Sequence, residues 1–141
     1  DIMENIHRRS ALAFGLSAGG TPLFAFARPA TAAYAADKGK ELYPGVRAVE
    51  LGERPSNIKA YKTISMVDLV YQPGTKTPLG EPMEHDMVCH VSDGELKIMA
   101  GDKEFSAKYG DVWSCGKGST KEAAVNAGSG VAERGMIFPE G

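Results

Sequence analysis

Turn signals recur along this chain, and they restrict its possible folds more than any other feature of the sequence. Each combines glycine, proline, serine or aspartate in a pair or triplet that favours a tight turn. They are Pro73-Gly74, Asp93-Gly94, Gly101-Asp102, Gly110-Asp111 and Gly128-Ser129-Gly130. The turns lie roughly ten residues apart and no convincing helical period separates them, a spacing typical of an all-β sandwich or barrel.

The segments between these turns carry strand patterns. Residues 46–51 (VRAVEL) alternate apolar and polar side chains, which indicates a strand with one buried face. Residues 58–71 are partly apolar on both faces, as in a strand bent through a barrel. Shorter strands are predicted at 87–92, 95–100, 103–108, 112–115, 122–127 and 131–138.

The composition allows a packed core and excludes several classes of partner. Apolar residues make up 43% of the chain and charged residues 24%, which favours a globular domain over disorder. The net charge of −2 provides no basic field for nucleic acid or an anionic membrane surface. The two cysteines are too few for a disulfide scaffold and lack Cys-x-x-Cys spacing.

The first 36 residues have the parts of an export signal. Arg8-Arg9 precedes an uncharged run over 10–27, and small residues end at Ala33-Tyr34-Ala35. The paired arginines and weakly hydrophobic middle resemble a twin-arginine signal peptide. We therefore predict an export signal at 1–36, a barrel domain at 37–141, and a periplasmic or secreted protein of bacterial origin.

Two other interpretations of this segment remain open. The arginines could belong to an ordinary secretory signal. Alternatively, the uncharged run approaches the roughly 20 residues needed to cross a bilayer, although Gly19-Gly20-Thr21-Pro22 interrupts it. An uncleaved segment of this kind would anchor the chain and make it an accessory subunit of a membrane complex.

The order of the turns resembles the cupin superfamily, a double-stranded β-helix (jelly-roll) barrel, over about Met66 to Phe138. Four pieces carry the resemblance: the start and end of the first cupin motif, then the start and end of the second. They are Gln72-Pro73-Gly74, the run 91–96 (VSDGEL), Gly110-Asp111-Val112-Trp113 and Asn126-Ala127-Gly128. The resemblance implies a small barrel that pairs as a homodimer.

The usual cupin metal ligands are not matched. The family carries His-x-His and a Glu in its first motif and a third His in its second. The family's Glu falls on Met87 and its third His on Glu122. The His-x-His pair falls on Gly80 and Pro82, or on Glu81 and Met83 if the loop is one residue shorter, and Cys115 replaces a family proline.

Two kinds of function fit this pattern. The first is a metal-free small-molecule-binding or accessory protein, with no cofactor and with a pocket lined by Glu81, Met83, Met87, Cys89, Glu122 and Asn126. The second is an enzyme acting on a small carbonyl or carboxylate compound, with His85 and Glu122 as general base and acid. In that case a divalent transition metal could bind Glu81, His85 and Glu122.

Two further groups of residues are open to more than one interpretation. Cys89 and Cys115 come from facing motifs, so they could form a disulfide or two buried thiols, and a reactive thiol paired with His85 is a third interpretation. If Met87 faces the interior, then Cys89 and Val91 face it too and His90 faces outward. There His90 would be a packing residue rather than a ligand.

Overall fold

The computed structural model describes residues 34–141, and residues 35–141 form one compact unit. The predicted export signal falls almost wholly outside this range, so its cleavage and route remain predictions. No helix long and apolar enough to span a membrane occurs among residues 34–141.

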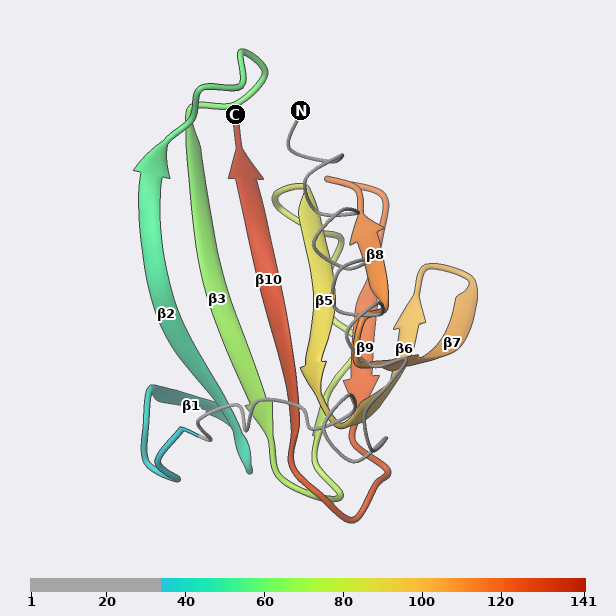
Figure 1. The fold of residues 1–141 in the computed structure, drawn as a ribbon. Helices are drawn as coiled ribbons and strands as arrows, with labels where there is room; N and C mark the ends of the chain where they lie inside the picture. The colour runs from blue at the N-terminus through green and yellow to red at the C-terminus, as the bar shows by residue number, and fades with distance from the viewer. Residues whose placement is uncertain (1–33) are drawn as a thin grey trace, which may run out of the picture. The chain divides into compact units, whose positions relative to one another are not determined.

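The described residues fold into two antiparallel sheets that face each other (Figure 1). One sheet has six strands, in the order β1 (Lys40–Tyr43), β2 (Val46–Pro55), β3 (Thr63–Tyr71), β10 (Ala132–Glu140), β5 (Met87–Asp93), β8 (Val112–Cys115). The other has four, in the order β4 (Lys76–Thr77), β9 (Glu122–Val125), β6 (Glu95–Ala100), β7 (Lys103–Lys108). The predicted all-β jelly-roll architecture is confirmed.

The core fills the space between the inner faces of the two sheets. On β6, Leu96 and Ile98 are buried while Glu95, Lys97 and Met99 are exposed, the alternation expected of a strand with one face in the core. On β5, Met87, Cys89 and Val91 are buried in the same way. The sequence alternation thus correctly identified the inner face of β5.

The turn between β5 and β6 requires glycine for two reasons. Gly94 has φ +67°, in the left-handed region that other residues enter at a cost. A Cβ there would also lie 2.7 Å from the carbonyl oxygen of Val131 and 2.9 Å from Cα of Ala132. The Asp93-Gly94 signal in the sequence therefore marks a place where two backbone segments cross closely.

Several strand boundaries differ from the sequence prediction. β1 and β4 were not predicted, and all side chains of β1 are exposed, so it forms by pairing with β2 and not by burying an apolar face. β2 continues to Pro55 through a bulge near Gly52, where a loop was predicted. β3 begins at Thr63, since residues 57–60 form a turn.

Candidate functional site

A buried arginine lies at the centre of the barrel. Arg134 is on β10, its side chain points to the inner face, and the residue is 1% exposed. Its Nη1 lies 2.5 Å from Oε1 of Glu122 on β9, and its Nη2–H donates to Sγ of Cys89 on β5 at 3.0 Å. Its guanidinium carbon is 5.1 Å from the centroid of the Trp113 ring on β8. The contacts of Arg134 thus come from both sheets.

Glu122 connects this arginine to two further side chains. Its Oε2 accepts hydrogen bonds from Trp113 Nε1–H at 2.9 Å and from Cys115 Sγ–H at 3.2 Å. A buried carboxylate is costly unless its charge is paired and its lone pairs are used. Both conditions hold for Glu122. Its contacts and those of Arg134 form one connected group, which we call the internal cluster: Arg134, Glu122, Trp113, Cys89 and Cys115.

The two thiols of the internal cluster are protonated at neutral pH. Burial raises the pKa of Cys89 to about 11, although the positive charge of Arg134 opposes this effect, and the negative charge of Glu122 adds to it. Burial, followed by the charge of Glu122, raises the pKa of Cys115 to about 12. Both cysteines are free thiols, and neither has the lowered pKa of a nucleophilic cysteine.

Arg134 keeps its positive charge despite its burial. Burial alone would lower its pKa, but Cys89, Glu122 and Tyr71 outweigh that effect and raise it above the ordinary value. One atom remains unmatched, because Nε of Arg134 is buried without a hydrogen-bond partner. Most buried polar atoms are paired, so this Nε–H is an unsatisfied donor within the core.

The residues at the ligand positions of the usual cupin metal centre do not fit such a centre. Glu122, at the position of the family's third histidine, already pairs with Arg134, and the buried guanidinium would repel a divalent cation. Met87, at the position of the family's glutamate, is 3% exposed within the core. Among residues 34–141, no group of three or more His, Cys, Asp and Glu side chains is arranged to hold a metal ion.

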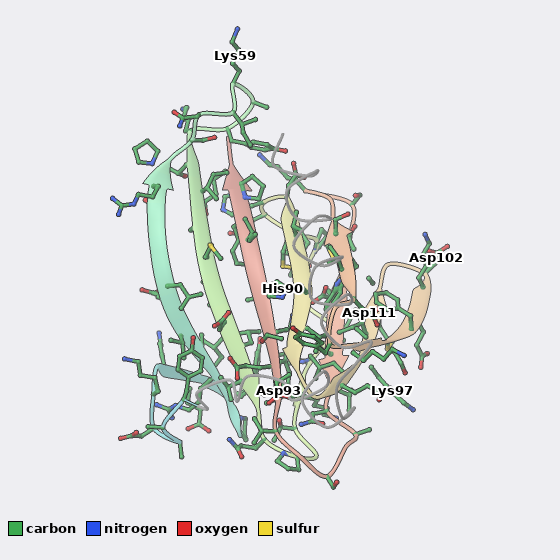
Figure 2. The ribbon with its side chains drawn as sticks, in the orientation of Figure 1. Lys59, His90, Asp93, Lys97, Asp102 and Asp111 are labelled. Carbon is green, nitrogen blue, oxygen red and sulfur yellow. The ribbon has the colours of Figure 1, made fainter. Side chains whose placement is uncertain are left out.

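His85 and Glu122 are not brought together. Nε2 of His85 lies 3.8 Å from Oε1 of Glu140, its side chain is 41% exposed, and no hydrogen bond or ion pair between described residues joins it to Glu122. Glu81 is exposed in the loop before β5. The other histidine considered, His90, lies on the outer face of β5 opposite Gly135, as the alternation predicts (Figure 2).

Asn126 has a structural role in the turn that follows β9. Its Nδ2 donates to the carbonyl oxygens of Tyr71, Gln72 and Gly130, and its Oδ1 accepts from the backbone N–H of Gly128. Both its amide nitrogen and its amide oxygen thereby have partners within the protein. Met83, like Met87, packs with the core.

An open pocket lies at the seam where the edges of the two sheets meet. β8 is an edge of the six-stranded sheet and β7 an edge of the four-stranded sheet, and Phe105 contacts Trp113 edge-to-face across them at 5.7 Å. Asp102 stands at the tip of the β6–β7 hairpin beside this seam (Figure 2). The lining residues are Ala100, Gly101, Asp102, Lys103, Phe105, Val112, Trp113, Ser114, Ser119 and Thr120.

Trp113 belongs both to the seam pocket and to the internal cluster. None of the six residues that the sequence predicted to line a ligand pocket lines this one. Arg134 and the seam residues were missed by sequence reasoning. One signal could have identified Arg134: it occupies an inward position of a strand, between the buried Ala132 and Met136. A charged residue at such a position must find a partner within the protein.

Comparison with known proteins identifies the fold. No family model and no curated protein matches the chain. Among solved structures, KdgF from Halomonas sp. is 15% identical with a TM-score of 0.59, over 72% of this chain and 86% of that one. An RmlC-like cupin from Shewanella frigidimarina is also 15% identical, with a TM-score of 0.58, over 72% of this chain and 82% of that one.

A cupin-superfamily sugar phosphate isomerase from Silicibacter pomeroyi is 18% identical, with a TM-score of 0.57, over 74% of this chain and 70% of that one. At these identities the likeness defines the fold and leaves the chemistry open. The chain has the cupin fold.

Proposed function

We propose that this chain is an exported, small-molecule-binding cupin in which a buried ion pair takes the place of the metal. The observation that carries the proposal is the position of Arg134, whose guanidinium fills the centre of the barrel and pairs with Glu122. In this arrangement the barrel centre supplies a fixed positive charge and a rigid support for Trp113. Among residues 34–141, no set of His, Cys, Asp and Glu side chains is arranged for the metal-dependent chemistry that is usual in cupins.

The ligand site of this proposal is the seam pocket. Its floor is aromatic, with Trp113 and Phe105, and its rim carries side chains that hydrogen-bond: Asp102, Lys103, Ser114, Ser119 and Thr120. An aromatic floor with a few polar groups around it is the usual form of a small-molecule site. It suits a sugar or sugar derivative, whose C–H face packs on an indole ring while its hydroxyls reach the rim.

The choice of a sugar as the ligand is supported by the chemistry of the pocket. One structural neighbour is described as a sugar phosphate isomerase, which agrees with this choice of ligand class but concerns that protein alone. Lys103 gives the rim a cation beside the carboxylate of Asp102. We therefore expect a sugar bearing an acidic group to bind more tightly than the corresponding neutral sugar.

Tryptophan fluorescence tests this proposal directly, because the chain contains a single tryptophan and it lies in the pocket. Glucose, glucuronate and glucose 6-phosphate are titrated separately, with calorimetry as a second readout. A saturable change that is weakened by Phe105→Ala and unaffected by Lys59→Ala, a substitution remote from the pocket, supports the proposal. No saturable change with any of the three sugars contradicts the choice of ligand class.

The enzyme alternative keeps the same fold but lacks its predicted acid–base pair, since His85 lies beside Glu140 and not beside Glu122. The accessory-subunit alternative depends on residues 1–33, which lie outside the described part of the chain. A homodimer likewise remains a prediction. None of these alternatives has a geometric observation in its favour, so small-molecule binding is the function that we propose.

A further inference from the structure

Glu133 is a buried carboxylate to which the described residues supply no partner. It lies on β10, and its side chain is on the outer face of the six-stranded sheet, because its neighbours Ala132 and Arg134 face the interior. The residue is 7% exposed, yet no hydrogen bond or ion pair among residues 34–141 involves its side chain. A buried carboxylate without a partner is costly, so its position calls for an explanation.

Two further carboxylates lie beside Glu133 on the same face. Asp93 on β5 is directly opposite Glu133 in the strand register, and Asp68 on β3 is opposite Gly135, two residues further along β10. Burial raises the pKa of Glu133 above its ordinary value of 4.5, and the charges of Asp68 and then Asp93 raise it further. These three like charges repel one another, an arrangement that a bound cation would stabilise. We call Asp68, Asp93 and Glu133 the outer acidic site.

The outer acidic site is accessible from solvent. Among residues 34–141, Nε of Arg134 is the one fully buried side-chain polar atom without a partner, so the oxygens of Glu133 retain some exposure. Asp68 and Asp93 are half-buried. A cation that approaches the outer face of the sheet therefore meets all three carboxylates.

Arg47, the cation in the same cross-strand row as Glu133, is used elsewhere. In the strand register Arg47 on β2 is opposite Val70 on β3, which is in turn opposite Glu133. The guanidinium of Arg47 donates to the carbonyl oxygens of residues 37–39 and lies 3.9 Å from the carboxylate of Glu41. Arg47 is therefore not a partner of Glu133.

A histidine and an exposed apolar strip border the outer acidic site. The ring of His90 lies across Gly135, where any side chain would overlap it (Figure 2). Two residues further along β10, Met66 and Val88 lie opposite Ile137 on the two neighbouring strands, and both are exposed. Acidic and apolar surfaces therefore adjoin on the outer face of this sheet.

We propose that the outer acidic site binds the guanidinium group of an arginine side chain carried by a partner polypeptide. A guanidinium presents several N–H donors in one plane, so it serves carboxylates on neighbouring strands at the same time. A metal ion needs ligands that converge on one point, and no group of three His, Cys, Asp or Glu side chains among residues 34–141 is arranged in that way. The inference does not rest on the proposed sugar pocket, which lies at the seam of the two sheets.

Charge and hydrophobicity favour an arginine within a polypeptide over free arginine. The free amino acid brings its own carboxylate, which the three acidic side chains repel, whereas an arginine residue brings only a positive charge. Apolar residues next to that arginine gain contact with Met66 and Val88 on the adjoining strip. The expected partner is therefore a segment in which arginine is flanked by apolar residues.

The test is an NMR titration of the isotope-labelled full chain with the peptide acetyl-Leu-Arg-Leu-amide, observed at the carboxyl carbon of Glu133. We expect saturable binding that lowers the pH midpoint of this carboxyl, because a bound cation favours its charged form. Acetyl-Leu-Gln-Leu-amide, which lacks the charge, should have no effect. If the arginine peptide produces no saturable change at Glu133, the proposal is overturned.

Two further ligands test the identity of the cation. If Ca²⁺ lowers the midpoint of Glu133 as far as the peptide does at equal concentration, the assignment to a guanidinium is overturned. If free arginine binds as tightly as the peptide, the assignment to a partner polypeptide is overturned.

The variant Glu133→Gln separates a binding role from a structural one. It should weaken binding of the arginine peptide by about tenfold or more, because hydrogen bonds to a charged group are lost. It should also raise the urea midpoint of unfolding, because one of three like charges is removed. Glu104→Gln is the matched control, since Glu104 is exposed on β7 of the other sheet and should change neither quantity. A Glu133→Gln variant that binds as the wild type does, or that unfolds at lower urea, would overturn the proposal.

Discussion

Glu122 and Arg134 form an ion pair at 2.5 Å, although their strands belong to different sheets. Glu122 is on β9 of the four-stranded sheet and Arg134 on β10 of the six-stranded sheet. This pair therefore joins the two layers of the barrel. It also holds Trp113, because the indole donates to the carboxylate and lies over the guanidinium.

Removing one partner of this pair should be far more damaging than removing both. Arg134→Met leaves Glu122 buried and unpaired, and we expect it to lower the free energy of unfolding by about 3–5 kcal/mol. The double variant Arg134→Met/Glu122→Gln should recover much of that loss, since no unpaired charge remains. Urea denaturation monitored by circular dichroism measures both changes.

Arg54→Met is the control for this comparison. Arg54 is exposed on β2, and a substitution there should change stability by no more than about 0.5 kcal/mol. A double variant as unstable as Arg134→Met alone would mean that packing of the arginine side chain, and not its charge, stabilises the barrel.

The hairpins of the fold were predictable because local signals determine them. Asp93-Gly94 and Gly101-Asp102 mark the turns on either side of β6, and the alternation along β5 and β6 gives their buried faces. β1 was not predictable in this way. All of its side chains are exposed, and it is a strand only because its backbone pairs with β2.

The site was less predictable than the fold. Glu122, Cys89 and Cys115 were singled out from the motif positions, but their common partner Arg134 was not. Arg134 and Glu122 lie on strands that do not pair with each other, so no strand register or local pattern brings them together. The seam pocket depends in the same way on two sheet edges that meet only in the folded barrel.

Two glycines with nearly equal backbone angles should differ in their tolerance of alanine. Gly94 has φ +67° and Gly101 has φ +64°, so the left-handed conformation should cost each alanine about 1–2 kcal/mol. A Cβ at Gly101 meets nothing within 4 Å, whereas one at Gly94 meets the backbone of Val131 and Ala132. Gly94→Ala should therefore lower the unfolding free energy by more than Gly101→Ala.

Urea denaturation of both variants measures their free energies of unfolding, and the difference between them reports the steric overlap at Gly94 apart from the backbone strain that both share. Equal losses of stability would show that the backbone around 131–132 moves away without cost.

The internal cysteines should make the barrel less stable at high pH. A thiol whose pKa is raised in the folded chain binds its proton more tightly there than in the unfolded chain. The stability that results is complete below the ordinary value of 9.0, and it is lost as pH rises towards about 11 for Cys89 and about 12 for Cys115.

We expect the urea midpoint of the wild type to fall more steeply above pH 9.0 than that of Cys89→Ala/Cys115→Ala. Because tyrosines and lysines titrate in the same range in both proteins, the difference between the two slopes reports the thiols. Parallel slopes would contradict the raised pKa values.

Asp86 should titrate at a lower pH than an ordinary aspartate. Its Oδ1 accepts the backbone N–H of Lys117 and its Oδ2 accepts the hydroxyl of Tyr61, each at 2.9 Å. These two bonds, the backbone one first, lower the pKa of the carboxyl below 3.8. Such bonds favour the charged form, so their stabilising effect is present above pH 3.8 and is lost as pH falls through the lowered pKa.

An NMR titration of the Asp86 carboxyl carbon measures this directly. The midpoint in the wild type should lie below 3.8 and should move upward in Tyr61→Phe, which removes one hydrogen bond and keeps the ring. Tyr43→Phe, on β1, removes a hydroxyl elsewhere and should leave the midpoint unchanged. If Tyr61→Phe leaves the midpoint in place, the N–H of Lys117 and not the hydroxyl of Tyr61 is responsible for the lowered pKa.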